Sequence, residues 1–326
     1  MTIYPWLKKI YKIIINQHIS KKLHHAVLIR SRINVGSKKL IFQLCKKILC
    51  KKSKKIFSCN ICHYCKLIDS KNHPDLNIIT PEINKKSIGI ETIIKYIKKI
   101  QNTSKFGKKT IIWIPKVHLL TESSINSFLK ILEDPPLKTI FFLDYCSLFK
   151  LKKTFKSRCI IYDIYPPIEK KGICWLKKKK NYKEKNILTA LRLSDNSPIL
   201  AKKIFHSSIW EIRKKFYKKI KKYIKKKNLF KLIKHFKKNT SKKIYWIFSL
   251  ILDVIKYYYN KNSKIINLDQ KKLIKIIKKK NNLKNLYFII NLWKKCFFYI
   301  KNIPNVNIKF ILLEPLIQWE KIFNFL

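Results

Sequence analysis

The first half of the chain alternates between short apolar segments and amphipathic segments, which constrains the fold more than any other feature. Residues 89–100 place Ile90, Ile93, Ile94 and Ile97 at the spacing of one helical face. Short apolar runs predict strands at residues 26–29, 75–80, 110–114, 139–145 and 159–165. Strands that alternate with helices predict an α/β fold with a parallel sheet.

Further helices are predicted at residues 5–19 and 40–49 and after residue 120. In the last of these, Thr121 is a plausible N-cap, and the helix must stop before Pro135 because proline lacks the N–H that continues a helix. Its expected buried stripe comprises Ile125, Phe128, Leu129 and Leu132.

The pattern changes after Pro166 and Pro167, and beyond residue 207 only helical periodicity remains. We therefore expect an α/β core domain at residues 1–166, a small helical domain at 167–207 and a larger all-α domain at 208–326.

The chain has a formal net charge of +58, with 75 basic and 17 acidic residues. Nucleic-acid binding is one explanation, because clustered cations release counterions from phosphates. Only five of the basic residues are arginine, however, and the lysines are spread along the chain among many Ile and Asn residues. We interpret the charge mainly as the coding bias of an AT-rich genome, with weak affinity for polyanions as a consequence.

No signal peptide and no membrane span are expected, since the apolar run that starts at Ile244 is interrupted by Ser249 and Asp253. The nine cysteines are an odd number in a long chain, which favours reduced thiols over a disulfide framework. A cytoplasmic location follows as the expectation.

Four of the cysteines, Cys50, Cys59, Cys62 and Cys65, have the spacing C-x8-C-x2-C-x2-C. Four thiolates at such spacing can close a tetrahedral zinc site. His63 lies inside the cluster and is a less suitable ligand, and free thiols are the alternative. Because no catalytic base lies nearby in the sequence, the zinc would be structural and would hold together a module at about residues 50–65.

A nucleotide-binding loop is expected between the first strand and its helix, but the loop here is degenerate. Gly36 stands where the second glycine of a P-loop belongs, followed by Ser37 and Lys38 where Lys and Ser/Thr are required. Pro115 and Lys116 follow the strand that should end in the magnesium-binding and water-orienting acids. We expect no ATP in this site, with weak binding through a shifted loop as the alternative.

Together, several segments resemble bacterial clamp-loader subunits of the AAA+ class. They are residues 23–29, the four cysteines, residues 73–75, 117–136 and 156–159, and residues 190–198. The resemblance covers the first 200 residues well and the last hundred mainly in helical character. Within the family, the degenerate loop and the "YPWL" of residues 4–7 are most similar to its non-catalytic subunits.

The resemblance implies an AAA+ core with a zinc module, a helical lid and an all-α collar that joins five subunits in an open ring. The implied partners are clamp-loader ATPase subunits of the tau/gamma type and a delta subunit, with the sliding clamp and primer–template DNA reached through the complex. The family motif Ser-Arg-Cys matches Ser157, Arg158 and Cys159. It implies that Arg158 reaches the γ-phosphate bound by a neighbouring subunit, and the alternative for Arg158 is a surface salt bridge.

The resulting hypothesis is a non-catalytic clamp-loader subunit of DNA polymerase III, without ATPase activity of its own. Asn196 to Ile199 stand where active members carry a lid arginine after a Gly-Ser pair, which agrees with this reading. The alternatives are a weakly active AAA+ ATPase and a zinc-containing nucleic-acid-binding protein.

Overall fold

The computed structural model describes residues 3–52, 56–83, 85–101, 109–178, 182–206, 208–236, 239–260, 263–303 and 307–324. The chain divides into two compact units, Met1–Pro167 and Ile168–Leu326, and each unit is described by itself. Among the described residues, no helix has both the length and the apolarity needed to cross a membrane.

The first unit is built on a five-stranded parallel sheet with the order β2-β3-β4-β1-β5. The strands are β1 (Ala26–Ser31), β2 (Leu76–Ile78), β3 (Thr110–Ile114), β4 (Thr139–Cys146) and β5 (Ile160–Ile164). The prediction of a parallel α/β sheet is confirmed, and all five strands occur where apolar runs predicted them.

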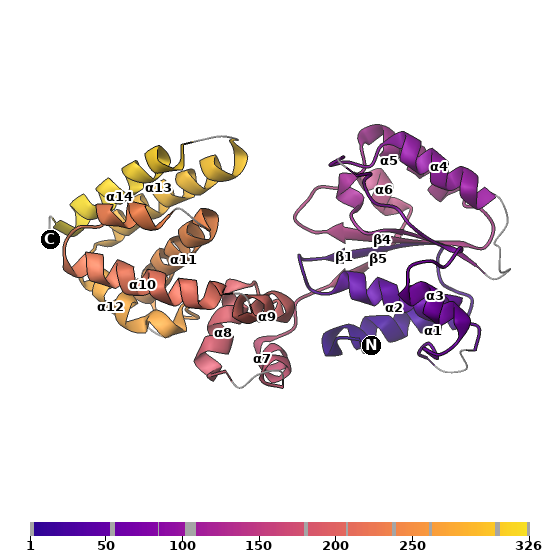
Figure 1. The fold of residues 1–326 in the computed structure, drawn as a ribbon, viewed down its shortest axis with the longest axis horizontal. Helices are drawn as coiled ribbons and strands as arrows, with labels where there is room; N and C mark the ends of the chain where they lie inside the picture. Colours follow the sequence, from indigo (N-terminus) through magenta and orange to yellow (C-terminus); the bar gives the residue numbers. More distant parts are fainter. Residues whose placement is uncertain are drawn as a thin grey trace. The chain divides into compact units, whose positions relative to one another are not determined.

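Helices cover both faces of this sheet, with α1, α2 and α3 on one side and α4, α5 and α6 on the other (Figure 1). Alternate residues of each central strand therefore enter two different cores: Val27 and Ile29 pack with α1 and α2, whereas Leu28 packs with α4 and α5. The helices of the unit are η1 (Pro5–Leu7), α1 (Lys8–Ile19), α2 (Ser37–Leu49), α3 (His63–Asp69), α4 (Ile90–Gln101), η2 (Val117–Leu119), α5 (Glu122–Glu133) and α6 (Lys153–Ser157).

The expected N-cap of α5 is confirmed, since the Thr121 side chain accepts a hydrogen bond from the backbone N–H of Ser124. The expected apolar face of α4 is only partly correct. Ile93 is fully buried, but Ile90 and Ile94 are exposed. The face of α4 that packs against the rest of the unit is narrower than the face formed by the four isoleucines. Ile90 and Ile94 therefore remain exposed to solvent.

The second unit contains helices and no strand among its described residues. They are α7 (Glu169–Lys177), α8 (Glu184–Leu193), α9 (Pro198–His206), α10 (Ile209–Lys225), η3 (Phe230–His235), α11 (Thr240–Tyr259), η4 (Leu268–Gln270), α12 (Lys271–Lys279), α13 (Leu283–Asn302) and α14 (Ile308–Asn324). One small core joins α7, α8 and α9 to Trp210, and a larger core is formed mainly by α10 to α14.

Arg213 is a fully buried charged residue of the second unit. Its guanidinium donates to Asp269 and to the side-chain oxygen of Asn267, and it lies over the rings of Trp210 and Tyr217. A buried cation without such partners would be strongly destabilising. This network joins α10 to the loop before α12.

Candidate metal centre and degenerate nucleotide site

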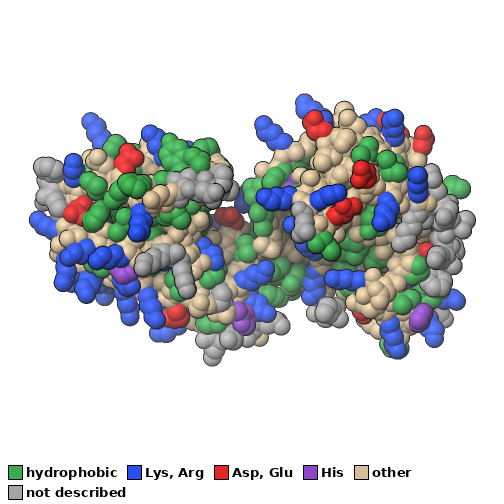
Figure 2. Space-filling view, turned by 45° about the horizontal axis from the view of Figure 1, so that its top comes forward, with side chains coloured by type: hydrophobic (Ala, Val, Ile, Leu, Met, Phe, Trp, Pro, Cys, Tyr) green, Lys and Arg blue, Asp and Glu red, His purple; other side chains and the backbone are tan. Residues whose placement is uncertain are grey.

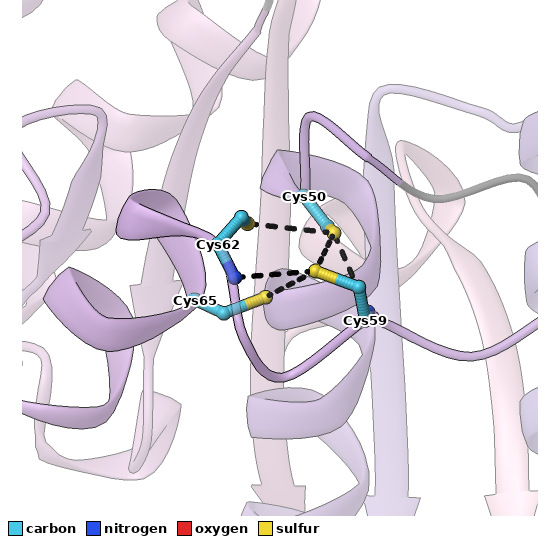
Figure 3. Close-up of side chains that lie close together, drawn as sticks. All are labelled: Cys50, Cys59, Cys62 and Cys65. Atoms are coloured by element: carbon cyan, nitrogen blue, oxygen red, sulfur yellow. Dashed lines mark hydrogen bonds between the residues drawn. The ribbon is translucent and has the colours of Figure 1, made fainter.

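The four cysteines of the predicted zinc module converge on one point, and all four Sγ atoms lie within 4.8 Å of one another (Figure 3). Cys50 Sγ is 3.4 Å from Cys59 Sγ and 3.9 Å from Cys62 Sγ, and Cys59 Sγ is 3.9 Å from Cys65 Sγ. Thiolates about 2.3 Å from a tetrahedral zinc would be about 3.8 Å apart. The cluster could therefore hold a metal ion, and its spacing and ligand type are compatible with zinc.

Local backbone structure explains how so short a segment presents its sulfurs together. Cys50 caps the C-terminus of α2, and Cys65 lies in the first turn of α3. Between them, Asn60 adopts a positive φ of 62°, and the Cys62 N–H points at Cys59 Sγ at 3.4 Å. This tight turn brings Cys59 and Cys62 to the same side of the loop.

The surroundings of the cluster favour thiolate at one position in particular. Hydrogen bonds from the backbone N–H groups of Cys62 and Ile61 lower the pKa of Cys59 to about 6. Burial instead raises the pKa of Cys50 and Cys65. A bound cation would offset that second effect, because a coordinating thiol is deprotonated by the metal.

His63 does not belong to the cluster of candidate ligands. Its side chain is exposed, and its ring meets Tyr64 edge-on. The structure therefore favours cysteine over histidine at all four positions, as the spacing predicted.

The module is fastened to the sheet domain on two sides. The Tyr11 hydroxyl of α1 donates to the Ile56 carbonyl at 3.0 Å, and the Tyr11 ring stacks on Phe57. The Lys46 ammonium of α2 pairs with Asp69 of α3 at 2.6 Å. These contacts attach the segment that carries the four cysteines to helices that pack on the sheet.

The degenerate nucleotide loop connects β1 to α2 and is covered by residues from the start of the chain. Gly36 has a φ of 107°, and a Cβ there would lie 2.7 Å from a carbon of the Tyr4 ring. Trp6 stacks on Tyr4 and donates its indole N–H to the Val35 carbonyl at 2.9 Å, while the Lys39 ammonium lies over the Tyr4 ring. Aromatic side chains thus pack directly on the loop that holds phosphates in a P-loop.

The side chain of Asp144, from β4, lies against the first residue of α2. The Ser37 hydroxyl donates to the Asp144 carboxylate of β4 at 2.9 Å, in a buried position. Burial raises the pKa of Asp144 from 3.8 to about 7. Asp144 is therefore only partly ionised near neutral pH, and its ionised form at this helix N-terminus disfavours the approach of a phosphate, because like charges repel.

Pro115 and Lys116 follow β3, where an NTPase would carry its acids. A pocket of about 580 Å³ lies beside α2 and the end of β3, and its lining includes Lys38 and Lys116 together with Trp113 and Pro115. The two lysines cannot hold magnesium as carboxylates do. Gly36 is the N-cap of α2, Ser37 and Lys38 begin the helix, and Lys116 lines the same pocket as Lys38.

Arg158 follows α6 and directly precedes β5. Its guanidinium donates to the Glu133 carboxylate at the end of α5, with 2.8 Å from Nε, and to the Thr154 carbonyl at 3.0 Å. Both charged partners are substantially exposed, so the ion pair is worth no more than about 1 kcal/mol. Ser157 donates locally to the Thr154 carbonyl, and Cys159 is buried.

Arg158 and the degenerate loop lie at opposite ends of the sheet. β5 pairs in parallel with β1, with Val27 opposite Ile160 and Ser31 opposite Ile164. Arg158 precedes the paired residues of β5, and the loop follows the paired residues of β1. Along the strand direction, the paired segment that separates them is roughly 13 Å long. Arg158 and the loop of its own chain therefore lie at opposite ends of the sheet.

Two hydrogen-bond partners in these sites, Asp144 of Ser37 and Glu133 of Arg158, were not predicted from the sequence. Asp144 is the single acid in an otherwise apolar strand, and a charge there signals a buried hydrogen-bond partner. Glu133 had no such signal, because its contact with Arg158 joins residues 25 positions apart.

Two segments of the chain, which together cover most of it, match known protein families. Residues 6–167 match the family "DNA polymerase III, delta subunit", and residues 207–321 match "DNA polymerase III, delta subunit, C terminal". The DNA polymerase III subunit delta' of Buchnera aphidicola subsp. Schizaphis graminum is 43% identical, covering 99% of this chain and 98% of the relative. The Escherichia coli subunit delta' is 27% identical, covering 82% of this chain and 80% of the relative.

Solved structures show a similar fold at low sequence identity. A Thermotoga maritima protein related to the DNA polymerase III gamma subunit aligns with a TM-score of 0.50 and 16% identity. The alignment covers 96% of this chain and 99% of that one. This similarity supports the fold, a sheet domain followed by helical parts.

Proposed function

Because the chain belongs to the family of DNA polymerase III delta' subunits, which are clamp-loader-related proteins, we propose that it is a non-catalytic member of the clamp-loader ring. In this role it supports ATP-driven loading of the sliding clamp onto primed DNA. Its partners are gamma-type ATPase subunits and a delta subunit in a five-subunit assembly. The match to the gamma subunit of Buchnera, 29% identical over 157 residues, supports a common origin with such ATPases.

The absence of hydrolysis in its own site rests on the residues around the loop. Tyr4 and Trp6 cover it, Asp144 lies at the start of α2, and Lys116 follows β3 in place of an acid. Each of these features disfavours a magnesium-bound nucleotide, since phosphate needs open backbone donors and magnesium needs carboxylates.

The single observation that carries the proposed role is the position of Arg158 at the end of the sheet opposite its own loop. We infer that an arginine at this end reaches the nucleotide of a neighbouring subunit and not its own loop. Its weak, exposed pairing with Glu133 leaves the guanidinium free to exchange partners. Arginine suits this role because its planar fork can contact two phosphate oxygens at once.

The remaining assignments follow the same family role. Zinc on Cys50, Cys59, Cys62 and Cys65 is structural and holds the loop between α2 and α3. Residues 167–207 form the lid and residues 208–326 the collar through which subunits associate. The small core around α7 to α9 and the larger core from α10 onward support this division.

The test uses complexes assembled from this chain and the gamma and delta subunits of the same organism. Arg158→Ala should leave assembly intact and lower clamp- and DNA-stimulated hydrolysis, because one composite site loses its cation. Loss of a trans arginine lowers the rate at the affected site by roughly 10³–10⁵. The other sites keep their own arginines, so total hydrolysis falls partially and clamp loading falls further.

Two controls complete this experiment. Arg158→Lys should restore little activity, since lysine is a single point charge without the planar fork. Arg30→Ala removes another partly exposed arginine–carboxylate pair, the one with Asp163, and its complexes should hydrolyse ATP like the wild type. If Arg158→Ala complexes assemble and then hydrolyse and load normally, Arg158 is a structural residue and the trans role is wrong.

A further inference from the structure

A cavity of about 580 Å³ lies at the carboxyl ends of β2 and β3, and the proposed clamp-loading role makes no use of it. Ile78 ends β2, and Pro115 and Lys116 directly follow β3. The helix α2 contributes Phe42 and Gln43 to the lining. The volume lies within the roughly 300–1,000 Å³ of pockets that hold small molecules. In open α/β sheets, ligands bind outside the carboxyl ends of the strands, which is where this cavity lies.

The cavity is distinct from the degenerate nucleotide loop. The loop follows β1, and the sheet order β2-β3-β4-β1-β5 places β4 between that strand and β3. Of the described residues that line the cavity, none comes from the loop or from the segment before it, whereas Lys38 and Lys39 at the start of α2 do line it. A ligand in the cavity would therefore lie beside the loop and would not use the backbone donors that hold phosphates in a P-loop.

Rings and branched aliphatic side chains form most of the lining. The ring-bearing residues are Phe42, Pro81, Trp113 and Pro115, and the aliphatic ones are Ile78, Ile79, Ile88 and Leu119. Trp113 is only 7% exposed, so its position is fixed by packing. Pockets with aromatic walls favour flat ring systems, because aromatic surfaces stack on one another in offset or edge-to-face arrangements. The lining therefore favours a planar ring over a flexible chain.

Gln43 supplies a polar group within this mainly apolar lining. The residue is 6% exposed, and its amide makes no hydrogen bond to the part of the chain that the structure describes. The amide is not sealed from the cavity, unlike the indole N–H of Trp113, which is buried and also lacks a partner among the described residues. Buried polar groups are nearly always hydrogen-bonded, so an unpartnered amide that lines a cavity indicates a ligand. An amide presents an acceptor and a donor side by side, and it is complementary to a ligand edge with a neighbouring N–H and carbonyl.

Four lysines also line the cavity, but they do not identify its ligand. They are Lys38, Lys39, Lys71 and Lys116. Figure 2 shows Lys and Arg side chains spread over the visible surface of each unit, so lysines around the cavity do not set it apart. The features that set it apart are the ring-lined wall and the unpartnered amide, and both suit an uncharged ligand.

We propose that the cavity binds a small, uncharged, planar ring compound whose edge carries a lactam or a carboxamide. The ring packs against Phe42 and Trp113. The N–H of the ligand edge donates to the amide oxygen of Gln43, and the ligand carbonyl accepts from the amide nitrogen of Gln43. This site is additional to the proposed clamp-loader role and does not depend on it.

The experiment uses the full-length chain as purified and quinolin-2-one as the probe, because the two fused rings of this compound are planar and one edge is a lactam. Ligand-observed NMR and calorimetry should give a Kd of roughly 0.1–5 mM, as expected for a ligand of this size. N-methylquinolin-2-one lacks the N–H and should bind at least about fivefold more weakly, because the Gln43 amide oxygen loses its donor. The ratio of the two affinities reports the hydrogen bond separately from the packing of the ring.

Two variants test the residues of the site. Gln43→Leu removes the amide and keeps most of the side-chain volume, so it should weaken quinolin-2-one binding at least about fivefold and remove its advantage over the N-methyl compound. Thr80→Trp places a large ring at an exposed position of the lining and should block binding. Gln318→Leu is the matched control, because it makes the same chemical change in α14 of the second unit, outside the lining, and should bind both compounds like the wild type. Thermal unfolding checks that every variant folds.

The possible negative results each have a defined meaning. If the wild-type chain does not bind quinolin-2-one at millimolar concentration, or binds N-methylquinolin-2-one equally well, the cavity is not a lactam site. If Gln43→Leu folds and keeps the wild-type ratio of affinities, or if Thr80→Trp binds normally, the ligand lies elsewhere and the inference is wrong. If Gln43→Leu does not fold, the pair of compounds and Thr80→Trp still decide. These measurements do not involve the gamma and delta subunits, so the proposed function stands or fails separately, on Arg158→Ala.

Discussion

Replacement of Asp144 by asparagine should stabilise the first unit at pH 8 far more than at pH 5. The Asp144 side chain is only 6% exposed, and burial raises its pKa from 3.8 to about 7. The folded chain therefore holds this proton more tightly than the unfolded chain does. The stability that results is fully present below about pH 4 and is lost as the pH rises through 7.

The magnitude follows from the two pKa values. Between 3.8 and about 7, at 1.36 kcal/mol per pKa unit, ionisation of Asp144 costs about 4 kcal/mol at pH 8. At pH 5 the same calculation gives about 1.6 kcal/mol. Asparagine does not ionise and can still accept the hydrogen bond from Ser37, so its advantage over the wild type should grow by roughly 2–3 kcal/mol between pH 5 and pH 8.

The assay is urea unfolding of both proteins at the two pH values, with hydrogen exchange of peptides from β4 to localise the effect. Asp163→Asn is the matched control, because the Arg30 guanidinium lowers the pKa of Asp163. Its stabilising contribution is present above the unfolded pKa and lost at lower pH, so Asp163→Asn should be no more stable than the wild type at either pH. If the effect of Asp144→Asn is the same at pH 5 and pH 8, the carboxylate is not a buried, destabilised charge.

Three further outcomes are expected. Metal analysis of the purified protein should find one zinc per chain, lost in Cys62→Ser and retained in Cys174→Ser, whose thiol lies outside the cluster; full zinc in Cys62→Ser would contradict the site. Calorimetry with ATP and magnesium should detect no micromolar binding to the isolated chain, and a measured micromolar affinity would favour an active ATPase. Gly36→Ala should lower the free energy of unfolding by about 1–3 kcal/mol in denaturant titrations, because its φ of 107° and the nearby Tyr4 ring leave no room for a Cβ; an unchanged midpoint would refute this.

Several features of the fold could be read from local sequence. Thr121 before an apolar stripe and Pro135 after it define α5 to within a residue at each end. The apolar runs defined five strands. Central strands such as β3 and β4 are buried on both faces and therefore need nearly continuous apolar residues, whereas the edge strand β5 is largely exposed. The cysteine spacing defined the ligand cluster, since two sulfurs three residues apart can be presented by one tight turn.

Other features were not readable in this way. Ile90 and Ile94 share a helical face with Ile93 in the sequence, yet they are exposed, because the width of the buried stripe depends on what packs against it. The short helix α3 was not predicted either. Its seven residues begin within the cysteine-rich segment and are too few to show a helical periodicity.

The sequence by itself therefore determined the classes of structure along the chain, the four cysteines that could hold a metal ion, and the departure from the residue pattern of a nucleotide-binding loop. These depend on residue type and short-range spacing, which each segment carries in itself. The tertiary structure decided that Asp144 meets Ser37, that Glu133 meets Arg158 and that Arg158 lies at the opposite end of the sheet from Gly36. Such contacts join residues 25 to 107 positions apart, and only the order of strands in the sheet brings them together.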